Sequence, residues 1–175
     1  MKGFKLKIAS KITTAAAAAS VVMLMTPGVS HADNPYWQLG SGGAGKCLEI
    51  ENSSSSNGAR AQQWSCGSQT GSYWKFRNRG DGWYSLENFS GKCLEVADSR
   101  TDNGAPVQQW SCAGNDTQEW KFSTGAGHYG NFALVNRNSG KVLEVENSST
   151  ANGARVQQWD FADTPGQGWS AGQVG

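Results

Sequence analysis

The segment Gly45-Lys-Cys-Leu-Glu-Ile50 recurs as Gly91-Lys-Cys-Leu-Glu-Val96 and as Gly140-Lys-Val-Leu-Glu-Val145. Each copy is followed by an Asn-Gly-Ala triplet and then by Gln-Gln-Trp, which ends at Trp64, Trp110 and Trp159. These tryptophans are 46 and 49 residues apart. A period of this length indicates supersecondary units that need their neighbours to bury an apolar face. Three units predict a closed assembly with pseudo-threefold symmetry, which would build the same site three times.

Short apolar segments at matched positions predict about four strands in each unit. Trp37-Gln-Leu39, Tyr84-Ser-Leu86 and Phe132-Ala-Leu134 open the units, and a second tryptophan closes each of them, at Trp74, Trp120 and Trp169. Aromatic residues in short, turn-rich segments are typical of all-β proteins, and no long stretch has helical spacing. A propeller usually needs at least four blades, and an open solenoid needs polar caps that the sequence lacks.

The first 32 residues have the pattern of a secretory signal peptide. Four lysines within residues 2–11 precede an uncharged apolar run from Ile12 to Met25, and Ser30-His31-Ala32 offers small residues for cleavage after Ala32. This run is shorter than the roughly 20 residues that span a bilayer, and no later segment is apolar enough to insert. We therefore expect a secreted, extracellular domain at residues 33–175, with repeats at about 33–80, 81–126 and 127–175.

Charge and length limit the partners of this domain. Of the 15 basic residues, four lie in the leader, so 11 basic and 14 acidic residues remain, a net charge near −3. Nucleic acid and anionic membranes prefer a basic face, so neither is expected as a partner. The remaining 143 residues are enough for one domain with an apolar core.

The cysteines form two pairs at the same separation of 19 residues, Cys47 with Cys66 and Cys93 with Cys112. In the third copy both are replaced together, by Val142 and Phe161, which we expect to pack in place of a bridge. Four cysteines allow three pairings. The cysteines of a pair are replaced together in the third copy, and export would place the protein in an oxidising compartment. Both observations favour the disulfides Cys47–Cys66 and Cys93–Cys112. A zinc site is the weaker alternative, because there is no C-x-x-C motif and His128, in a Gly-rich linker, is the one histidine after the leader. No metal or cofactor is expected.

The disulfides also suggest a strand register. If paired cysteines lie opposite each other on antiparallel strands, Glu49 lies opposite Trp64, Glu95 opposite Trp110 and Glu144 opposite Trp159. Because side chains alternate between faces, each glutamate then shares a face with its tryptophan. The turns would fall beside Asn57, Asn103 and Asn152, where Asn-Gly is a turn signal.

In these three motifs the chain resembles the ricin B-type lectin family. The resemblance covers the whole chain after the leader, through G-K-C-L-E, Q-Q-W-x-C and the later Q-x-W, in order and with matched spacing. It implies an all-β fold, a β-trefoil of three pseudo-repeats. It also implies a domain that binds glycans or polysaccharides, including those of a glycoprotein, and that is not an enzyme.

The resemblance assigns the binding residues position by position. In that family each unit has a carboxylate two residues after the first cysteine, an aromatic platform two before the second, and an Asn-Gln pair at the closing Q-x-W. The matching carboxylates are Glu49, Glu95 and Glu144, the platforms are Trp64, Trp110 and Trp159, and the glutamines are Gln118 and Gln167. The family's core tryptophan matches Trp74, Trp120 and Trp169.

The chain departs from the family pattern at three positions, and the third departure makes units two and three the better candidate sites. The family carboxylate is usually Asp, and here it is Glu in every unit, which leaves the sugar open. The family Asn is replaced by Gly71, Thr117 and Gly166, and unit one has Ser72 in place of the Gln.

These residue types suit a pyranose, whose apolar C–H face can lie on an indole. A carboxylate at the ring edge accepts hydrogen bonds from two neighbouring hydroxyls, and a Gln amide adds a donor and an acceptor. The alternative is structural, with solvated glutamates and tryptophans that cap the core.

Two other function classes remain open. Catalysis by a carboxylate pair such as Glu49 with Glu51 or Glu144 with Glu146 is the weaker hypothesis, since unit two has Ala97 at the second position. A protein-binding trefoil, as an inhibitor or adhesin, and a targeting subunit of a secreted enzyme are the further alternatives, because a fold does not determine a function.

Overall fold

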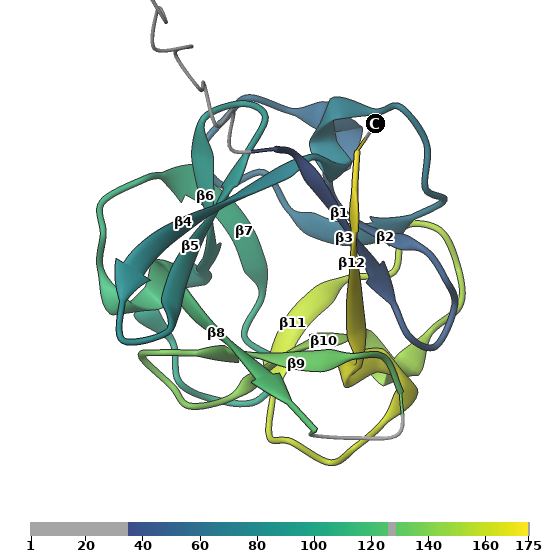
Figure 1. Cartoon of the computed structure of the whole chain (residues 1–175). Helices are drawn as coiled ribbons and strands as arrows, with labels where there is room; N and C mark the ends of the chain where they lie inside the picture. The colour runs from purple at the N-terminus through teal and green to yellow at the C-terminus, as the bar shows by residue number, and fades with distance from the viewer. Residues whose placement is uncertain (1–34, 126–128, 175) are drawn as a thin grey trace, which may run out of the picture. The chain divides into compact units, whose positions relative to one another are not determined.

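Twelve β-strands and six short 3₁₀ helices make up the computed structural model over its described residues, 35–125 and 129–174. The expected signal peptide and His128 lie outside these residues. In chain order the strands form three sequence repeats of four: β1 (Trp37–Ser41), β2 (Cys47–Ile50), β3 (Ala61–Trp64) and β4 (Trp74–Gly80); β5 (Trp83–Asn88), β6 (Lys92–Val96), β7 (Val107–Ser111) and β8 (Glu119–Thr124); β9 (Phe132–Asn136), β10 (Val142–Val145), β11 (Val156–Trp159) and β12 (Trp169–Gln173). In space β4 pairs with the next repeat and lies beside β5–β7, β8 lies beside β9–β11, and β12 lies beside β1–β3 (Figure 1).

The 3₁₀ helices also repeat from unit to unit. One follows the second strand of each unit and one precedes the fourth: η1 (Glu51–Ser53) and η2 (Thr70–Ser72), η3 (Ala97–Ser99) and η4 (Asp116–Gln118), η5 (Glu146–Ser148) and η6 (Pro165–Gln167). None of the helices in the described part of the chain is long and apolar enough to cross a membrane.

Six strands close into a barrel and six form three hairpins. Antiparallel pairing runs from β1 to β4, β5, β8, β9, β12 and back to β1, so the ring has no open edge. The hairpins β2–β3, β6–β7 and β10–β11 complete the units. This is the β-trefoil arrangement that the three repeats predict.

The core repeats the same residues three times. One leucine from the first strand, one from the second and the closing tryptophan of each unit are buried: Leu39, Leu48 and Trp74; Leu86, Leu94 and Trp120; Leu134, Leu143 and Trp169. Each of these indole N–H groups donates to the leucine carbonyl of its own hairpin, at 3.1, 3.0 and 3.0 Å. The prediction that these tryptophans belong to the core is confirmed.

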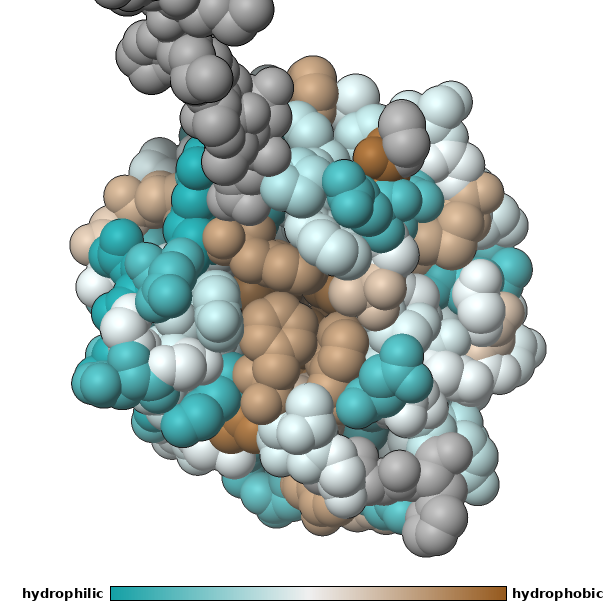
Figure 2. Space-filling model, in the orientation of Figure 1, coloured by the Kyte–Doolittle hydropathy of each residue, from teal (hydrophilic) through white to brown (hydrophobic). Residues whose placement is uncertain are grey.

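Aromatic rings from barrel strands pack against one another near the core. Phe122 contacts Phe76, Tyr84 and Phe132 edge to face, with ring centroids 4.9–5.4 Å apart. Figure 2 shows apolar residues gathered at the centre of the face seen in Figure 1, over the barrel strands. Edge-to-face packing is a favoured arrangement of aromatic pairs and stabilises beyond area burial alone.

The hairpin register differs from the expected one by two residues. Cys47 lies opposite Trp64, and Glu49 lies opposite Gln62 rather than Trp64. The same correction places Glu95 opposite Gln108 and Glu144 opposite Gln157. A shift of two preserves the face, so the expectation that each glutamate shares a face with its tryptophan holds.

Both expected disulfides are present, and they explain the shift. Cys47–Cys66 and Cys93–Cys112 join Cα atoms 5.0 and 5.1 Å apart. Cys66 lies two residues beyond the end of β3, so the bridge joins β2 to the segment that follows β3 rather than two opposed strand positions. The expected apolar substitute in unit three is not formed as a buried pair, because Val142 is buried but Phe161 is 48% exposed.

Three buried glutamines, the second Gln of each Gln-Gln-Trp, tie the units together. Gln109 donates from Nε2 to the carbonyls of Ser54 and Ser56 in unit one, at 2.7 and 2.9 Å. Gln158 binds unit two in the same way, and Gln63 binds unit three. Each unit is therefore held by the next around a closed ring.

The Asn-Gly turns take part in the same contacts. Asn57 Oδ1 accepts the Ser111 backbone N–H at 3.0 Å, and the pairs Asn103–Asp160 and Asn152–Ser65 repeat this bond. The turns lie where the sequence predicts them, but their hydrogen bonds reach into the neighbouring unit.

Candidate functional site

Three cavities occur at equivalent places, one on each hairpin. We call them site 1 (Glu49 and Trp64), site 2 (Glu95 and Trp110) and site 3 (Glu144 and Trp159). Their volumes are about 450, 260 and 350 Å³, respectively. Each predicted carboxylate lines the same cavity as its predicted platform.

The structural alternative predicts exposed glutamates and tryptophans that are buried against the core. The observed burial is the opposite. The glutamates are only 5, 9 and 7% exposed, whereas Trp64, Trp110 and Trp159 are 42, 43 and 39% exposed. Carboxylates are seldom buried without a partner, and ligand pockets are commonly lined by aromatic side chains. The tryptophans therefore do not cap the core, and the glutamates are not solvated strand residues.

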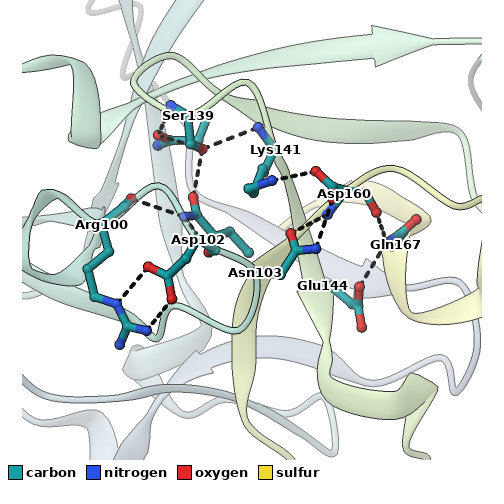
Figure 3. Close-up of polar contacts among 10 residues, drawn as sticks. Arg100, Asp102, Asn103, Ser139, Lys141, Glu144, Asp160 and Gln167 are labelled. Carbon is teal, nitrogen blue, oxygen red and sulfur yellow. Dashed lines mark hydrogen bonds and ion pairs between the residues drawn. The ribbon is translucent and has the colours of Figure 1, made fainter.

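A buried glutamine orients the carboxylate in sites 2 and 3. Gln118 Nε2 donates to Glu95 Oε2 at 2.7 Å and to the Ser111 carbonyl at 3.0 Å, while its Oε1 accepts the Ala113 N–H at 2.8 Å. Gln167 makes the same three bonds to Glu144, Asp160 and Ala162. Figure 3 shows Gln167 between Glu144 and Asp160, with Asn103 of unit two and Lys141 also bound to Asp160.

These bonds change the role expected for the two glutamines. Both are essentially fully buried, and both amide hydrogens and the amide oxygen already have partners. An amide of this kind has no donor left for a ligand. Gln118 and Gln167 therefore position Glu95 and Glu144, and the expected direct contact with a ligand is not supported by this geometry.

Site 1 lacks this arrangement because Ser72 stands at the Gln position. The Ser72 hydroxyl donates to the Gln69 carbonyl at 2.8 Å, away from the carboxylate. Gln69 Nε2 instead donates to the Ser65 carbonyl at 2.6 Å, which replaces one of the three bonds. Glu49 keeps only a long bond from Gln62 Nε2, at 3.4 Å.

Weak partnering at site 1 affects the protonation of Glu49. Burial raises the pKa of its carboxyl above the ordinary value of 4.5, the Gln62 hydrogen bond opposes this rise, and the nearby negative charge of Glu51 adds to it. Because the folded-state pKa is above the unfolded one, this group favours folding at low pH. That contribution is lost as the pH rises through the folded-state pKa.

Glu49→Gln is therefore expected to make the protein more stable than the native chain at pH 7. The gain should disappear below about pH 4.5, where the native carboxyl is protonated in both states. Urea unfolding at pH 4 and pH 7 measures the difference. Glu95→Gln is the matched control, and it should destabilise at pH 7, because Gln108 and Gln118 both donate to the Glu95 oxygens. Equal destabilisation by the two substitutions would contradict this account of site 1.

Sequence reasoning missed an ion pair beside sites 1 and 3. Arg60 Nη2 lies 2.9 Å from Glu51 Oε1 and 3.1 Å from Gln62 Oε1. In unit three, Arg155 bonds Glu146 and Gln157, both at 2.8 Å. The signal was present as E-N-S-S followed by N-G-A-R, at 51–60 and 146–155, whereas unit two has Ala97 and Pro106 at these positions.

Two further features required the tertiary structure. A glycine of the preceding unit lies against each platform, so that a Cβ on Gly153, Gly58 or Gly104 would sit 3.6–3.8 Å from Trp64, Trp110 or Trp159. The second residue of η1, η3 and η5 has positive φ near 55° and lines each cavity: Asn52, Asp98 and Asn147. Asn and Asp adopt this left-handed conformation more readily than other non-Gly residues.

In units one and three, a glycine replaces the Asn of the family pattern for a steric reason. A Cβ on Gly71 would lie 2.5 Å from the Ile50 carbonyl oxygen, and one on Gly166 would lie 2.5 Å from that of Val145. Both glycine N–H groups bind a serine hydroxyl, from Ser53 and Ser148, at 2.9 and 3.0 Å. Units one and three therefore have no room for a larger residue there without a backbone shift.

Each hairpin of the closed trefoil thus carries a buried carboxylate and an exposed indole in one cavity. The profile of the ricin-type beta-trefoil lectin domain family matches residues 35–169. The chain belongs to this family. A search of the curated proteins found no match.

Solved structures agree with this assignment. The designed threefold-symmetric protein ThreeFoil is 38% identical, over 79% of this chain and 99% of that one, with a TM-score of 0.75. The exo-beta-1,3-galactanase 1,3Gal43A from Clostridium thermocellum is 29% identical over 82% of this chain, with a TM-score of 0.76, and the match spans only 31% of that enzyme. The Rhizoctonia solani agglutinin shares the fold at 19% identity, over 81% of this chain and 96% of that one, with a TM-score of 0.71.

Proposed function

We propose that this protein is a secreted domain that binds carbohydrate without catalysis. The observation that carries the proposal is the repeated pairing of an exposed indole with a buried, hydrogen-bonded carboxylate in one cavity. The predicted signal peptide supports secretion, and membership of the lectin-domain family supports a glycan as the ligand.

The indole supplies an apolar contact surface for the sugar, and the carboxylate determines the orientation of the sugar ring. A pyranose lying on Trp110 or Trp159 removes its own C–H face and the indole from water. Glu95 and Glu144 then accept hydrogen bonds from ring hydroxyls at the edge of the sugar, and a charged acceptor strengthens these bonds. Because Gln118 and Gln167 already hold these carboxylates in place, sugar binding loses little conformational entropy by ordering them.

Sites 2 and 3 are the better-ordered sites, and site 1 binds with a less constrained carboxylate. A single shallow site is expected to have a dissociation constant near the millimolar level, which corresponds to about 4 kcal/mol. Several sites on one rigid domain raise the avidity for a polymeric glycan by roughly a hundredfold when their spacing fits the polymer.

The arrangement of the carboxylates supports binding rather than hydrolysis. Glu51 and Glu146, the second carboxylates of units one and three, are each held in an ion pair with an arginine. Unit two has Ala97 at this position. An acid–base pair needs one carboxyl that keeps its proton and a partner across the scissile bond.

A glycan array followed by isothermal titration tests the proposal. We expect binding to at least one class of neutral sugar or polysaccharide, and no release of reducing ends from the glycans that are bound. An array with no signal above background would overturn the proposal in favour of a protein-binding trefoil. Turnover of a bound glycan would overturn the non-catalytic part alone.

A further inference from the structure

A second cavity of about 470 Å³ adjoins site 1. It shares three lining residues with the cavity of site 1, namely Glu51, Asn52 and Arg60. The rest of its wall comes from the loop that leads to β3, at residues 54 and 56–59. The two cavities therefore meet at the Glu51–Arg60 ion pair. We call the second one the loop cavity.

The wall of the loop cavity is held in place by unit two. Gln109 Nε2 binds the Ser54 and Ser56 carbonyls, and the Gly58 N–H donates to the Gln109 carbonyl at 2.9 Å. Asn57 is fixed through its Oδ1 by the Ser111 N–H. The conformation of the loop is thus determined when the domain folds. Binding of a ligand in the loop cavity therefore loses little conformational entropy by ordering the loop.

The lining of the loop cavity differs in kind from that of site 1. It presents serine hydroxyls, asparagine amides, a carboxylate and a guanidinium, and none of its lining residues is aromatic. Glu51 and Arg60, at 43 and 37% side-chain exposure, are accessible where the two cavities meet. Such a surface suits the hydroxyl edge of a sugar, whereas Trp64 suits the flat face of one.

Unit three repeats these residues and unit two does not. Glu146 and Arg155 form the equivalent ion pair at 2.8 Å, within a loop that has nearly the same sequence as residues 51–60. In unit two, Pro106 replaces the arginine and Ala97 replaces the glutamate. There Arg100 is instead paired with Asp102 within the loop. The described residues thus contain two copies of the ion pair, in units one and three, and unit two provides a natural comparison without it.

We infer that sites 1 and 3 each bind at least two linked sugar units, with Arg60 or Arg155 contacting the second unit, whereas site 2 binds one. This inference rests on the proposed carbohydrate binding and adds a ligand class to it. The ligand of sites 1 and 3 is an oligosaccharide segment within a chain, and the guanidinium donates to hydroxyl or ring oxygens at the linkage between the two units.

Isothermal titration in a Trp110→Ala background, which removes the platform of site 2, tests the inference. The probes are galactose, xylose, and the β-1,3-galacto- and β-1,4-xylo-oligosaccharides of two to four units. For the sugar series that binds, we expect the affinity to rise about tenfold from one unit to two or three. Adding Arg60→Ala and Arg155→Ala should abolish that rise, so that the ratio of oligosaccharide affinity to monosaccharide affinity falls to about one.

The matched control is Arg100→Ala in the same background. It removes one exposed arginine from the corresponding loop of unit two, and the Arg100 carbonyl that binds Gln158 is retained. This variant should keep the full dependence on chain length. Near-UV circular dichroism checks that every variant is folded.

Two outcomes separate this inference from the proposed function. Affinity that does not depend on chain length, or an arginine double variant that loses monosaccharide and oligosaccharide binding equally, overturns the inference alone. No binding to any probe by the protein with Trp110 intact overturns the proposed function for these sugars and the inference with it.

Discussion

Trp120→Ala is expected to lower the free energy of unfolding by about 3–5 kcal/mol. Trp120 is fully buried among the leucines of the core, and its indole N–H donates to the Leu94 carbonyl at 3.0 Å. The substitution leaves a large cavity and an unpaired buried carbonyl. Since a domain of this size has about 5–15 kcal/mol of total stability, this single change removes a large part of it. Urea denaturation followed by tyrosine and tryptophan fluorescence measures the loss.

The matched control is Trp110→Ala, which removes the same atoms from an exposed position. Trp110 is the next-to-last residue of β7, with its indole beside Gly58 of unit one, so its loss should cost less than about 1 kcal/mol of stability. If the two variants were equally destabilised, the division between core and platform tryptophans would be wrong. Trp74→Ala and Trp169→Ala should resemble Trp120→Ala, because their indoles make the same bond.

The double variant Trp110→Ala with Trp159→Ala is expected to lose most glycan binding and to remain folded. Burial of one indole face against a sugar contributes about 2 kcal/mol, so each altered site should weaken about thirtyfold. Because avidity depends on sites acting together, retention on an immobilised polysaccharide should fall further than the affinity of either site. Affinity electrophoresis through a gel containing the polysaccharide identified on the array measures this retention.

Glu95→Gln and Glu144→Gln provide the comparison for this loss. They keep both indoles and alter the acceptor, so binding should be retained in part, with a weaker choice among hydroxyl epimers. Unchanged retention in the double tryptophan variant would mean that the inherited platforms at sites 2 and 3 do not bind the glycan. In that case Trp64→Ala would show whether site 1 accounts for all of the binding.

Much of the fold could be predicted from local sequence, because it depends on repeats that each unit carries. Equal spacing of the cysteine pairs, and their joint replacement in unit three, predicts the two observed disulfides. The leucines and closing tryptophans recur at the same positions, and these positions are buried in all three units. Side-chain alternation also correctly predicted that each glutamate lies on the same face as its tryptophan. The face depends only on whether the number of residues along the strand is odd or even, and a shift of two leaves it unchanged.

The strand register could not be obtained in this way. A disulfide requires only that two Cα atoms approach to about 5–6 Å, and a diagonal position meets this requirement as well as an opposed one. Cys66 lies two residues beyond the end of β3, so the hairpin is displaced by two residues from the register that opposed cysteines would impose.

The roles of the polar residues were decided by tertiary structure. The sequence by itself determined a trefoil with three candidate sites and identified the carboxylates and platforms that the structure brings together. It could not show that Gln118 and Gln167 are saturated with hydrogen bonds, because two of the three partners are backbone groups positioned by the loop after the platform strand. Nor could it place Gly58, Gly104 and Gly153 against the platforms of other units, or join the loop cavity to site 1. The contacts between these glycines and the platforms exist only after the ring of three units closes, when residues about 50 or more positions apart come together.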